Sequence, residues 1–292
     1  MVGQGTGYRR GSVWARSAIR AGRLWPRLFT EELRRPVFIV GCGRSGTTLV
    51  AGLLDTHPEV AVYPTEANDL WHPGAYPWRR TALDTAPFLV DPKGFTEAST
   101  AQWVDDDTHT LMGCFRAFQR FSHAAVFANK SAMLAFMIPR VLELFPRCRF
   151  IHVLRDGRPV ACSYAKKQAE KQDLHRRVFE ERGEFYSMDE LLLLAARTWS
   201  TQVEEILRRV DQLALGSHRL LEVRYERLCS RPEHELQRIA AFLGIAPSAF
   251  DRSRVAKIRS RDDSYRSSLD SDQIAAITDA TRHVRATTGY AG

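Results

Sequence analysis

Two kinds of apolar pattern alternate along the chain. Short runs rich in β-branched residues predict buried strands at 37–40, 60–62, 125–128, 149–154 and 219–223. Longer stretches, with apolar residues every three or four positions, predict helices that begin at Thr47 or span 99–121, 133–144, 159–171 and 188–210. Strands that alternate with helices are typical of a parallel sheet covered on both faces. The chain therefore predicts an α/β fold with three layers, α/β/α, around a central, mostly parallel sheet.

Two further segments have recognisable boundaries. Residues 64–95 are rich in proline, glycine and aromatic residues. They predict a long excursion after the second strand, at the end of the sheet where open α/β folds bind ligands. Ser230 and Glu233 have the spacing of a capping box and predict a helix that starts at Ser230 and ends at Gly244.

The first 35 residues are basic, with eight arginines and no acid before Glu31. Arginines and apolar residues fall on opposite faces of a predicted helix, Arg16, Arg20, Arg23 and Arg27 against Trp14, Ala18, Ala21, Trp25 and Leu28. Ser12 is a suitable N-cap and Pro26 would end the helix. We divide the chain into this segment, 1–35, and a main domain, 36–292, that carries the candidate chemistry.

Two interpretations of the basic segment stay open. In one, the helix packs over the main domain and its arginines face solvent. In the other, residues 12–29 lie on an anionic membrane, as basic amphipathic helices with tryptophans do, or form an organellar transit peptide of similar composition. We favour the packed helix.

Composition narrows the class of protein only in part. A net charge of +8 and a pI near 9.5 favour anionic partners without choosing among them. The five cysteines are scattered and lack metal-binding spacing, which favours a reducing, cytoplasmic compartment. No apolar run reaches the length of about 18 residues that a transmembrane helix needs.

A glycine-rich turn joins the first strand to the helix at Thr47. From Gly41 to Thr48 its spacing matches a Walker A loop, but Thr47 stands where the nucleotide-binding lysine would be. Glycines and a helix N-terminus present backbone N–H groups to an anion. Arg44, earlier in the loop, can add a bidentate contact. The loop predicts a cradle for a phosphate-like group held without the usual lysine and metal.

Polar residues also follow the ends of other predicted strands. Arg155 directly follows the strand at 149–154, and Ser163 lies eight residues later in the next helix, so both can reach one anion. Lys130 follows another strand, and Glu66 lies in the excursion. The alternatives are structural: a helix cap at the Arg-Asp-Gly turn, and a solvated surface position for Lys130.

Another acidic run is less informative. Asp105, Asp106 and Asp107, with His109, could hold a cation, but an acidic helix start is the simpler interpretation.

The loop resembles the 5′-phosphosulfate loop of the sulfotransferases that use 3′-phosphoadenosine 5′-phosphosulfate (PAPS). It is most similar to the branch of tyrosylprotein sulfotransferases and bacterial relatives, which carry arginine at the position of Arg44. The resemblance spans roughly residues 36–265 and implies a P-loop NTPase-like sulfotransferase fold. In that family the matching loop residues bind the 5′-phosphosulfate, which implies this role for Arg44, Ser45, Gly46, Thr47 and Thr48.

A second specific motif of the family matches as well, together with looser ones. The Arg-Asp-Gly-Arg run with its trailing serine resembles the 3′-phosphate site, which implies this role for Arg155 and Ser163. Tyr225, in Arg-Tyr-Glu-Arg-Leu, resembles a tyrosine near the adenine. Lys257 and Arg259 with Ser260 resemble a closing loop on the 3′-phosphate side. A packed aromatic and a solvated basic loop are the alternatives.

The resemblance implies direct transfer of a sulfuryl group from PAPS, with 3′-phosphoadenosine 5′-phosphate (PAP) as product and no metal. Glu66 would take the proton of the acceptor hydroxyl, while Arg44 and Lys130 stabilise the developing charge. A phenol, a lipid alcohol, a glycan or a peptide tyrosine could be the acceptor. No nucleic-acid partner is implied, and a homodimer stays open.

Two other functions remain as alternatives. A P-loop kinase or nucleotide hydrolase would need Mg²⁺ and a carboxylate on a second strand. A non-catalytic module would bind the nucleotide without turnover.

Overall fold

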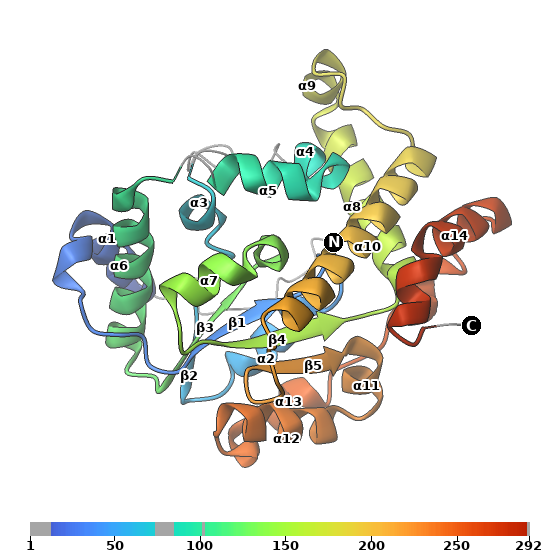
Figure 1. Ribbon diagram of the computed structural model, residues 1–292. Coiled ribbons are helices and arrows are strands. Elements are labelled where there is room, and N and C mark those ends of the chain that lie inside the picture. The colour runs from blue at the N-terminus through green and yellow to red at the C-terminus, as the bar shows by residue number, and fades with distance from the viewer. Residues whose placement is uncertain (1–12, 74–84, 101–102, 291–292) are drawn as a thin grey trace.

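The computed structural model describes residues 13–73, 85–100 and 103–290 (Figure 1). At its centre lies a five-stranded sheet in the order β2-β3-β1-β4-β5. The strands are β1 (Pro36–Val40), β2 (Val60–Val62), β3 (Val126–Lys130), β4 (Arg149–Leu154) and β5 (Leu220–Arg224). Each neighbouring pair is parallel. The carboxyl ends of these strands therefore meet at one edge of the sheet.

Helices make up most of the remaining described chain. They are α1 (Val13–Leu24), α2 (Thr47–Leu54), α3 (Asn68–Trp71), α4 (Thr85–Val90), α5 (Pro92–Thr100), α6 (Asp105–Ser122), α7 (Ile138–Leu144), α8 (Gly157–Leu174), α9 (Arg176–Glu181), α10 (Met188–Gln212), α11 (Tyr225–Ser230), α12 (Pro232–Leu243), α13 (Arg252–Val255) and α14 (Ser271–Thr287). Short 3₁₀ turns are η2 (Pro26–Leu28), η3 (Ala132–Phe136), η4 (Pro247–Ala249) and η5 (Asp262–Tyr265).

Apolar side chains bury both faces of the sheet. On one face, Ile39 packs with Leu54 of α2 and Leu236 of α12. On the other, Phe38 packs with Phe115 of α6. All five residues of β1 are buried because this strand lies in the middle of the sheet. The predicted three-layer α/β/α fold is confirmed, and beyond β4 the helices α8, α10 and α14 pack together (Figure 1).

The basic helix α1 packs along α6. Ala15 and Ala18 are buried, and the Trp14 ring stacks on Phe118 with 5.3 Å between centroids. A Cβ on Gly22 would lie 2.5 Å from the carbonyl oxygen of Gly113, so only small residues allow this approach. The favoured interpretation of a packed helix is confirmed for these residues.

Two apolar residues of the basic segment that were predicted to lie on its packed face are exposed instead. Trp25 and Leu28 are 57% and 70% exposed. The helix ends at Leu24, just before Pro26, so the helical spacing does not carry them onto α6. Ser12 lies outside the described residues, and the membrane contact stays a prediction. No helix in the described ranges is long and apolar enough to span a bilayer.

Several predicted boundaries are wrong. The helix at 99–121 begins at Asp105, and the stretch at 133–144 divides into η3 and α7. Ser230 does not cap α12: it is the last residue of α11, its Oγ donates to the Arg227 carbonyl, and Arg231 is the N-cap. The acidic run does start a helix, since Asp107 Oδ2 accepts from the backbone N–H of Val104 at 3.1 Å.

Candidate active site

The carboxyl edge of the sheet collects the predicted residues from all five strands. Glu66 follows β2, Lys130 ends β3, the glycine-rich loop follows β1, Arg155 follows β4 and Tyr225 follows β5. Given the strand order, these groups lie along the edge in that same sequence. The fold thus places the candidate base and the candidate anion-binding groups side by side.

The loop after β1 turns tightly toward α2. Gly41 has φ of 145°, and a Cβ there would lie 2.4 Å from the carbonyl oxygen of Val153. Gly46, the N-cap of α2, has φ of 98°. Arg44 also adopts a left-handed conformation, with φ of 72°, which is uncommon for a residue with a Cβ and is typical of functional loops. The turn leads into the N-terminus of α2, the part of a helix whose N–H groups are suited to bind an anion.

Ser45 contributes to this loop through its hydroxyl. Its backbone N–H donates to the Cys42 carbonyl at 3.1 Å. Its Oγ is buried and has no hydrogen-bond partner among the described residues. A buried hydroxyl is normally satisfied, so a bound anion would supply the missing partner.

A basic cavity of about 770 Å³ opens beside the loop. Seven basic residues line it, Arg44, Arg155, Lys166, Lys167, Lys257, Arg259 and Arg261, and Glu170 is the single acidic residue of its lining. Thr47, Thr48 and Ser163 also line it. Such a concentration of positive charge attracts an anionic ligand.

The structure brings the two predicted anion sites into direct contact. Arg44 Nε donates to Ser163 Oγ at 3.1 Å, and Arg155 Nη1 donates to the Arg44 carbonyl at 3.2 Å. Burial, and the neighbouring Arg155, lower the pKa of Arg44. Both effects disfavour the charged guanidinium, and a bound anion would oppose them.

Tyr225 packs between the loop and Arg155. The Arg155 guanidinium carbon lies 4.0 Å from the centroid of the Tyr225 ring. A Cβ on Gly46 would lie 2.6 Å from Tyr225 Cδ2. Burial raises the pKa of the Tyr225 hydroxyl to about 12. The packed aromatic is therefore observed, and the adenine contact stays a prediction.

On the other side of the loop, Lys130 and Glu66 form an ion pair through Nζ and Oε1. The Lys130 side chain is 9% exposed and that of Glu66 36%, so the carboxylate is the more accessible partner. Asn129 Nδ2 donates to the Thr65 carbonyl at 3.3 Å, which ties the end of β3 to the residue before Glu66. Ala67 has φ of 54°, so the backbone around Glu66 is held in an uncommon conformation.

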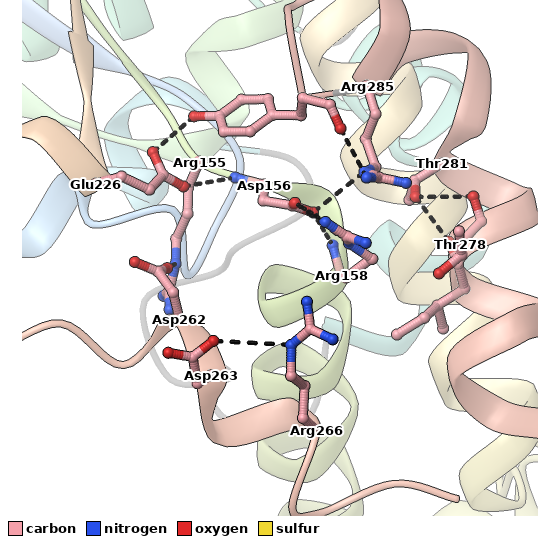
Figure 2. Close-up of polar contacts among 12 residues, drawn as sticks. Arg155, Asp156, Arg158, Glu226, Asp262, Asp263, Arg266, Thr278, Thr281 and Arg285 are labelled. Atoms are coloured by element: carbon pink, nitrogen blue, oxygen red, sulfur yellow. Dashed lines mark hydrogen bonds and ion pairs between the residues drawn. The ribbon is translucent and has the colours of Figure 1, made fainter. Parts of the chain in front are cut away.

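The segment after α13 contributes a carboxylate that sequence analysis missed. Lys257 lines the cavity, whereas Ser260 Oγ donates to Asp262 Oδ2 at 2.6 Å. Asp262 Oδ1 in turn accepts from Arg155 Nε at 2.9 Å (Figure 2).

Lys166 and Lys167 were also missed. Helical spacing from Ser163 could have identified them, because residues three and four positions apart share a helix face. No local pattern marks Asp262, which lies 107 positions from Arg155.

The aromatic residues of the excursion divide into two groups. Tyr63 and Trp71 are buried in the core against α6. Phe88 packs with Met133 in a separate apolar cluster beside α4 and η3. Tyr76 and Trp78 lie outside the described residues.

Residues 36–249 match the family model of the sulfotransferase family. The chain belongs to this family. It is 25% identical over 218 residues to protein-tyrosine sulfotransferase A of Caenorhabditis elegans, and 27% identical over 228 residues to nodulation protein NoeE of Sinorhizobium fredii. Each alignment covers 72% of this chain and 50% of the relative, so the chain spans half the length of these proteins.

A solved member of the sulfotransferases shares the fold. Sulfotransferase STF9 from Mycobacterium avium superposes with a TM-score of 0.61 at 16% identity, covering 94% of this chain and 81% of that one. The resemblance drawn from the loop is confirmed for the family and for its fold. The roles of the individual residues stay predictions.

Proposed function

We propose that this protein transfers the sulfuryl group of PAPS to a hydroxyl of an acceptor, with Glu66 as general base. The observation that carries the proposal is the order of groups along the sheet edge. A carboxylate and a paired lysine lie on one side of the loop, and a basic cavity lies on the other. Donor and acceptor can therefore approach the loop from opposite sides, as an in-line displacement requires.

Each residue has a defined task in this reaction. The N-terminus of α2, Arg44 and the Ser45 hydroxyl hold the 5′-phosphosulfate. The acceptor oxygen forms a bond to sulfur while the bond from sulfur to the bridging phosphate oxygen breaks. Glu66 takes the acceptor proton, and Arg44 and Lys130 stabilise the negative charge that develops on the bridging oxygen. The products are a sulfate ester and PAP.

The residues at the end of β3 favour sulfuryl transfer over magnesium-dependent phosphoryl transfer. A kinase or hydrolase with a Walker-type site would hold Mg²⁺ with a carboxylate at a strand end. Here β3 ends in Asn129 and Lys130, and Asn129 Oδ1 already accepts from Trp71 Nε1 at 3.0 Å. The Lys130 ammonium at this position suits a donor such as PAPS, whose negative charge would be neutralised by side chains and not by Mg²⁺.

Radiolabelled PAPS tests the proposal directly. The protein is incubated with the donor and a panel of phenols, lipid alcohols, glycans and tyrosine peptides, with and without a chelator. Peptide tyrosine comes first because several relatives carry that name. We expect transfer that persists with chelator. Transfer lost on chelation would favour the metal-dependent alternative, and binding of PAP without any transfer would favour the non-catalytic module.

The variant Glu66→Gln tests the base. It should lower turnover by about a hundredfold or more, because general-base catalysis typically contributes that much. PAP binding should stay unchanged. Glu59→Gln is the matched control, since Glu59 precedes β2 on the same segment but lies at the opposite end of the strand. Equal turnover of the two variants would remove Glu66 from its role.

A further inference from the structure

Arg155 is a buried arginine whose backbone is fixed from several directions. Its side chain is 7% exposed. Its carbonyl accepts from Trp199 Nε1 at 3.1 Å. A Cβ on Gly157, two residues later, would lie 2.6 Å from the Trp199 ring, so α10 packs directly on this turn. Arg155 therefore has little freedom to move.

The residue after Arg155 is held by a second set of contacts (Figure 2). The backbone N–H of Asp156 donates to Glu226 Oε1 at 3.0 Å, and the Tyr290 hydroxyl donates to Glu226 Oε2 at 2.7 Å. The Asp156 carboxylate pairs with Arg158 at 2.6 Å and with Arg285 at 3.4 Å. This network connects the end of β4 to α11 and to the end of α14, and it makes the turn rigid.

Asp262, which pairs with Arg155, is the more exposed partner. Its side chain is 25% exposed, and its carboxylate oxygens contact Arg155 Nε and Ser260 Oγ. Asp262 belongs to η5, a short 3₁₀ turn that follows the basic residues Lys257, Arg259 and Arg261 of the cavity lining. The Arg155 guanidinium is thus fixed, and the carboxylate that neutralises it lies on a surface segment.

Asp262 accepts a hydrogen bond from Nε of the Arg155 guanidinium. The family resemblance implies that this same guanidinium binds the 3′-phosphate. A buried guanidinium without an anion is costly, so an internal carboxylate stabilises the nucleotide-free protein. A 3′-phosphate brings up to two negative charges to the same guanidinium, and it meets repulsion from the carboxylate already there.

We propose that Asp262 is an internal counter-ion that competes with the nucleotide 3′-phosphate for Arg155. This inference rests on the proposed function. Nucleotide binding displaces the Asp262 carboxylate from Arg155 Nε, and the carboxylate returns when PAP leaves. Asp262 thereby lowers the affinity for 3′-phosphorylated nucleotides selectively and speeds release of the product, because affinity differences in one site appear mainly in the dissociation rate. It is a positioning residue that acts through Arg155.

The test compares two ligands on three variants. Calorimetry measures binding of PAP and of adenosine 5′-monophosphate, which lacks the 3′-phosphate, to the wild type, Asp262→Asn and Asp262→Glu. Asp262→Asn should tighten PAP binding about tenfold or more, because a like charge close to the phosphate is removed. Binding of the monophosphate should change less than about twofold. Asp262→Glu keeps the charge and should restore the weaker PAP binding.

Asp263→Asn is the matched control. Asp263 is the next residue, its side chain is 96% exposed, and it pairs with Arg266 at 3.7 Å (Figure 2). Its loss should leave both affinities unchanged. A merely structural Asp262 would give weaker or unchanged PAP binding in Asp262→Asn, which overturns the inference. Wild-type protein that binds no PAP would overturn the proposed function as well, so the two failures are distinguishable. Stopped-flow measurement of PAP dissociation should show slower release from Asp262→Asn.

Discussion

The two halves of the candidate site, which we name the nucleotide half and the acceptor half after their proposed ligands, differ in how their charges are balanced. The nucleotide half, around the β1 loop, β4 and α8, has seven basic residues and one acidic residue in its cavity lining. The acceptor half, around β2 and β3, contains one lysine, Lys130, already paired with Glu66. One half carries excess positive charge, and the other is close to neutral before any ligand binds.

The two halves are also built from different parts of the chain. In the nucleotide half the backbone forms much of the candidate anion site. Arg44 and Gly46 adopt left-handed conformations, and the N-terminus of α2 follows them. In the acceptor half, side-chain hydrogen bonds from Trp71 to Asn129 and from Ser131 to Asn68 fix the residues that flank the ion pair of Lys130 and Glu66. We infer that the nucleotide half gains binding energy from charge, while the acceptor half gains rate from geometry. Variants should therefore separate affinity from turnover.

The largest expected effect comes from Arg44. Arg44→Ala removes the only side-chain cation within the loop and should lower turnover by about a hundredfold to a thousandfold, as loss of one preorganised charge contact typically does. It should also weaken PAP binding, unlike Glu66→Gln. Steady-state kinetics and calorimetry measure the two effects.

Arg35→Ala is the control for Arg44→Ala. Arg35 also has a positive φ, 46°, but lies before β1, at the opposite edge of the sheet, where it donates to the Gly244 carbonyl. It should retain wild-type turnover and PAP affinity. A turnover for Arg44→Ala as high as that of Arg35→Ala would contradict the division into halves.

A second variant tests the backbone of the nucleotide half. Gly46→Ala places a Cβ 2.6 Å from Tyr225 at a φ of 98°, and we expect it to destabilise the fold by about 1–3 kcal/mol and to weaken PAP binding. Gly52→Ala is the control: Gly52 lies within α2, and its Cβ would meet nothing within 4 Å. Because alanine is the better helix former, that variant should be more stable by up to about 1 kcal/mol. Denaturant unfolding gives both values, and equal stability of the two variants would refute the steric argument.

Sequence predicted which groups of the nucleotide half lie together because its signals are local. A strand, a glycine turn and a helix start lie within a dozen residues in the β1 loop, and again from β4 to Ser163. Spacing along the chain then fixes which groups meet in space. Local signals also predicted the sheet and its layers, because strand-like and helix-like apolar patterns alternate along the chain.

The rest of the site depends on contacts between distant segments. Asp262 meets Arg155 only because the chain returns to the carboxyl edge after α13. Trp71 lies in the predicted excursion and Tyr63 directly before it, but packing against α6 buries both residues in the core. Ser230 matches a capping box, yet α11 extends through it. Tertiary packing therefore decides the place of Asp262, Tyr63 and Trp71, and the neighbouring helix decides that of Ser230.

The last expected effect concerns stability in acid, to which each half contributes one buried histidine. Burial lowers the pKa of His152, on β4, to about 4 and that of His72, after α3, to about 3. Both fall below the ordinary value near 6.5, so the unfolded chain binds these protons first. The stability that the neutral histidines confer is complete above about pH 6.5 and is lost as the pH falls toward the folded pKa values.

At pH 5 each histidine should account for a loss of about 2 kcal/mol, since each pKa unit corresponds to about 1.4 kcal/mol. His152→Gln and His72→Gln, which do not titrate, should each remove about half of the difference in unfolding free energy between pH 7 and pH 5 that the pair produces. Denaturant unfolding at the two pH values measures this difference. Similar losses in the two variants would show that both histidines are held neutral in the folded protein. A pH dependence left intact in one variant would show that its histidine has no lowered pKa in the folded state, which would contradict the prediction for that residue.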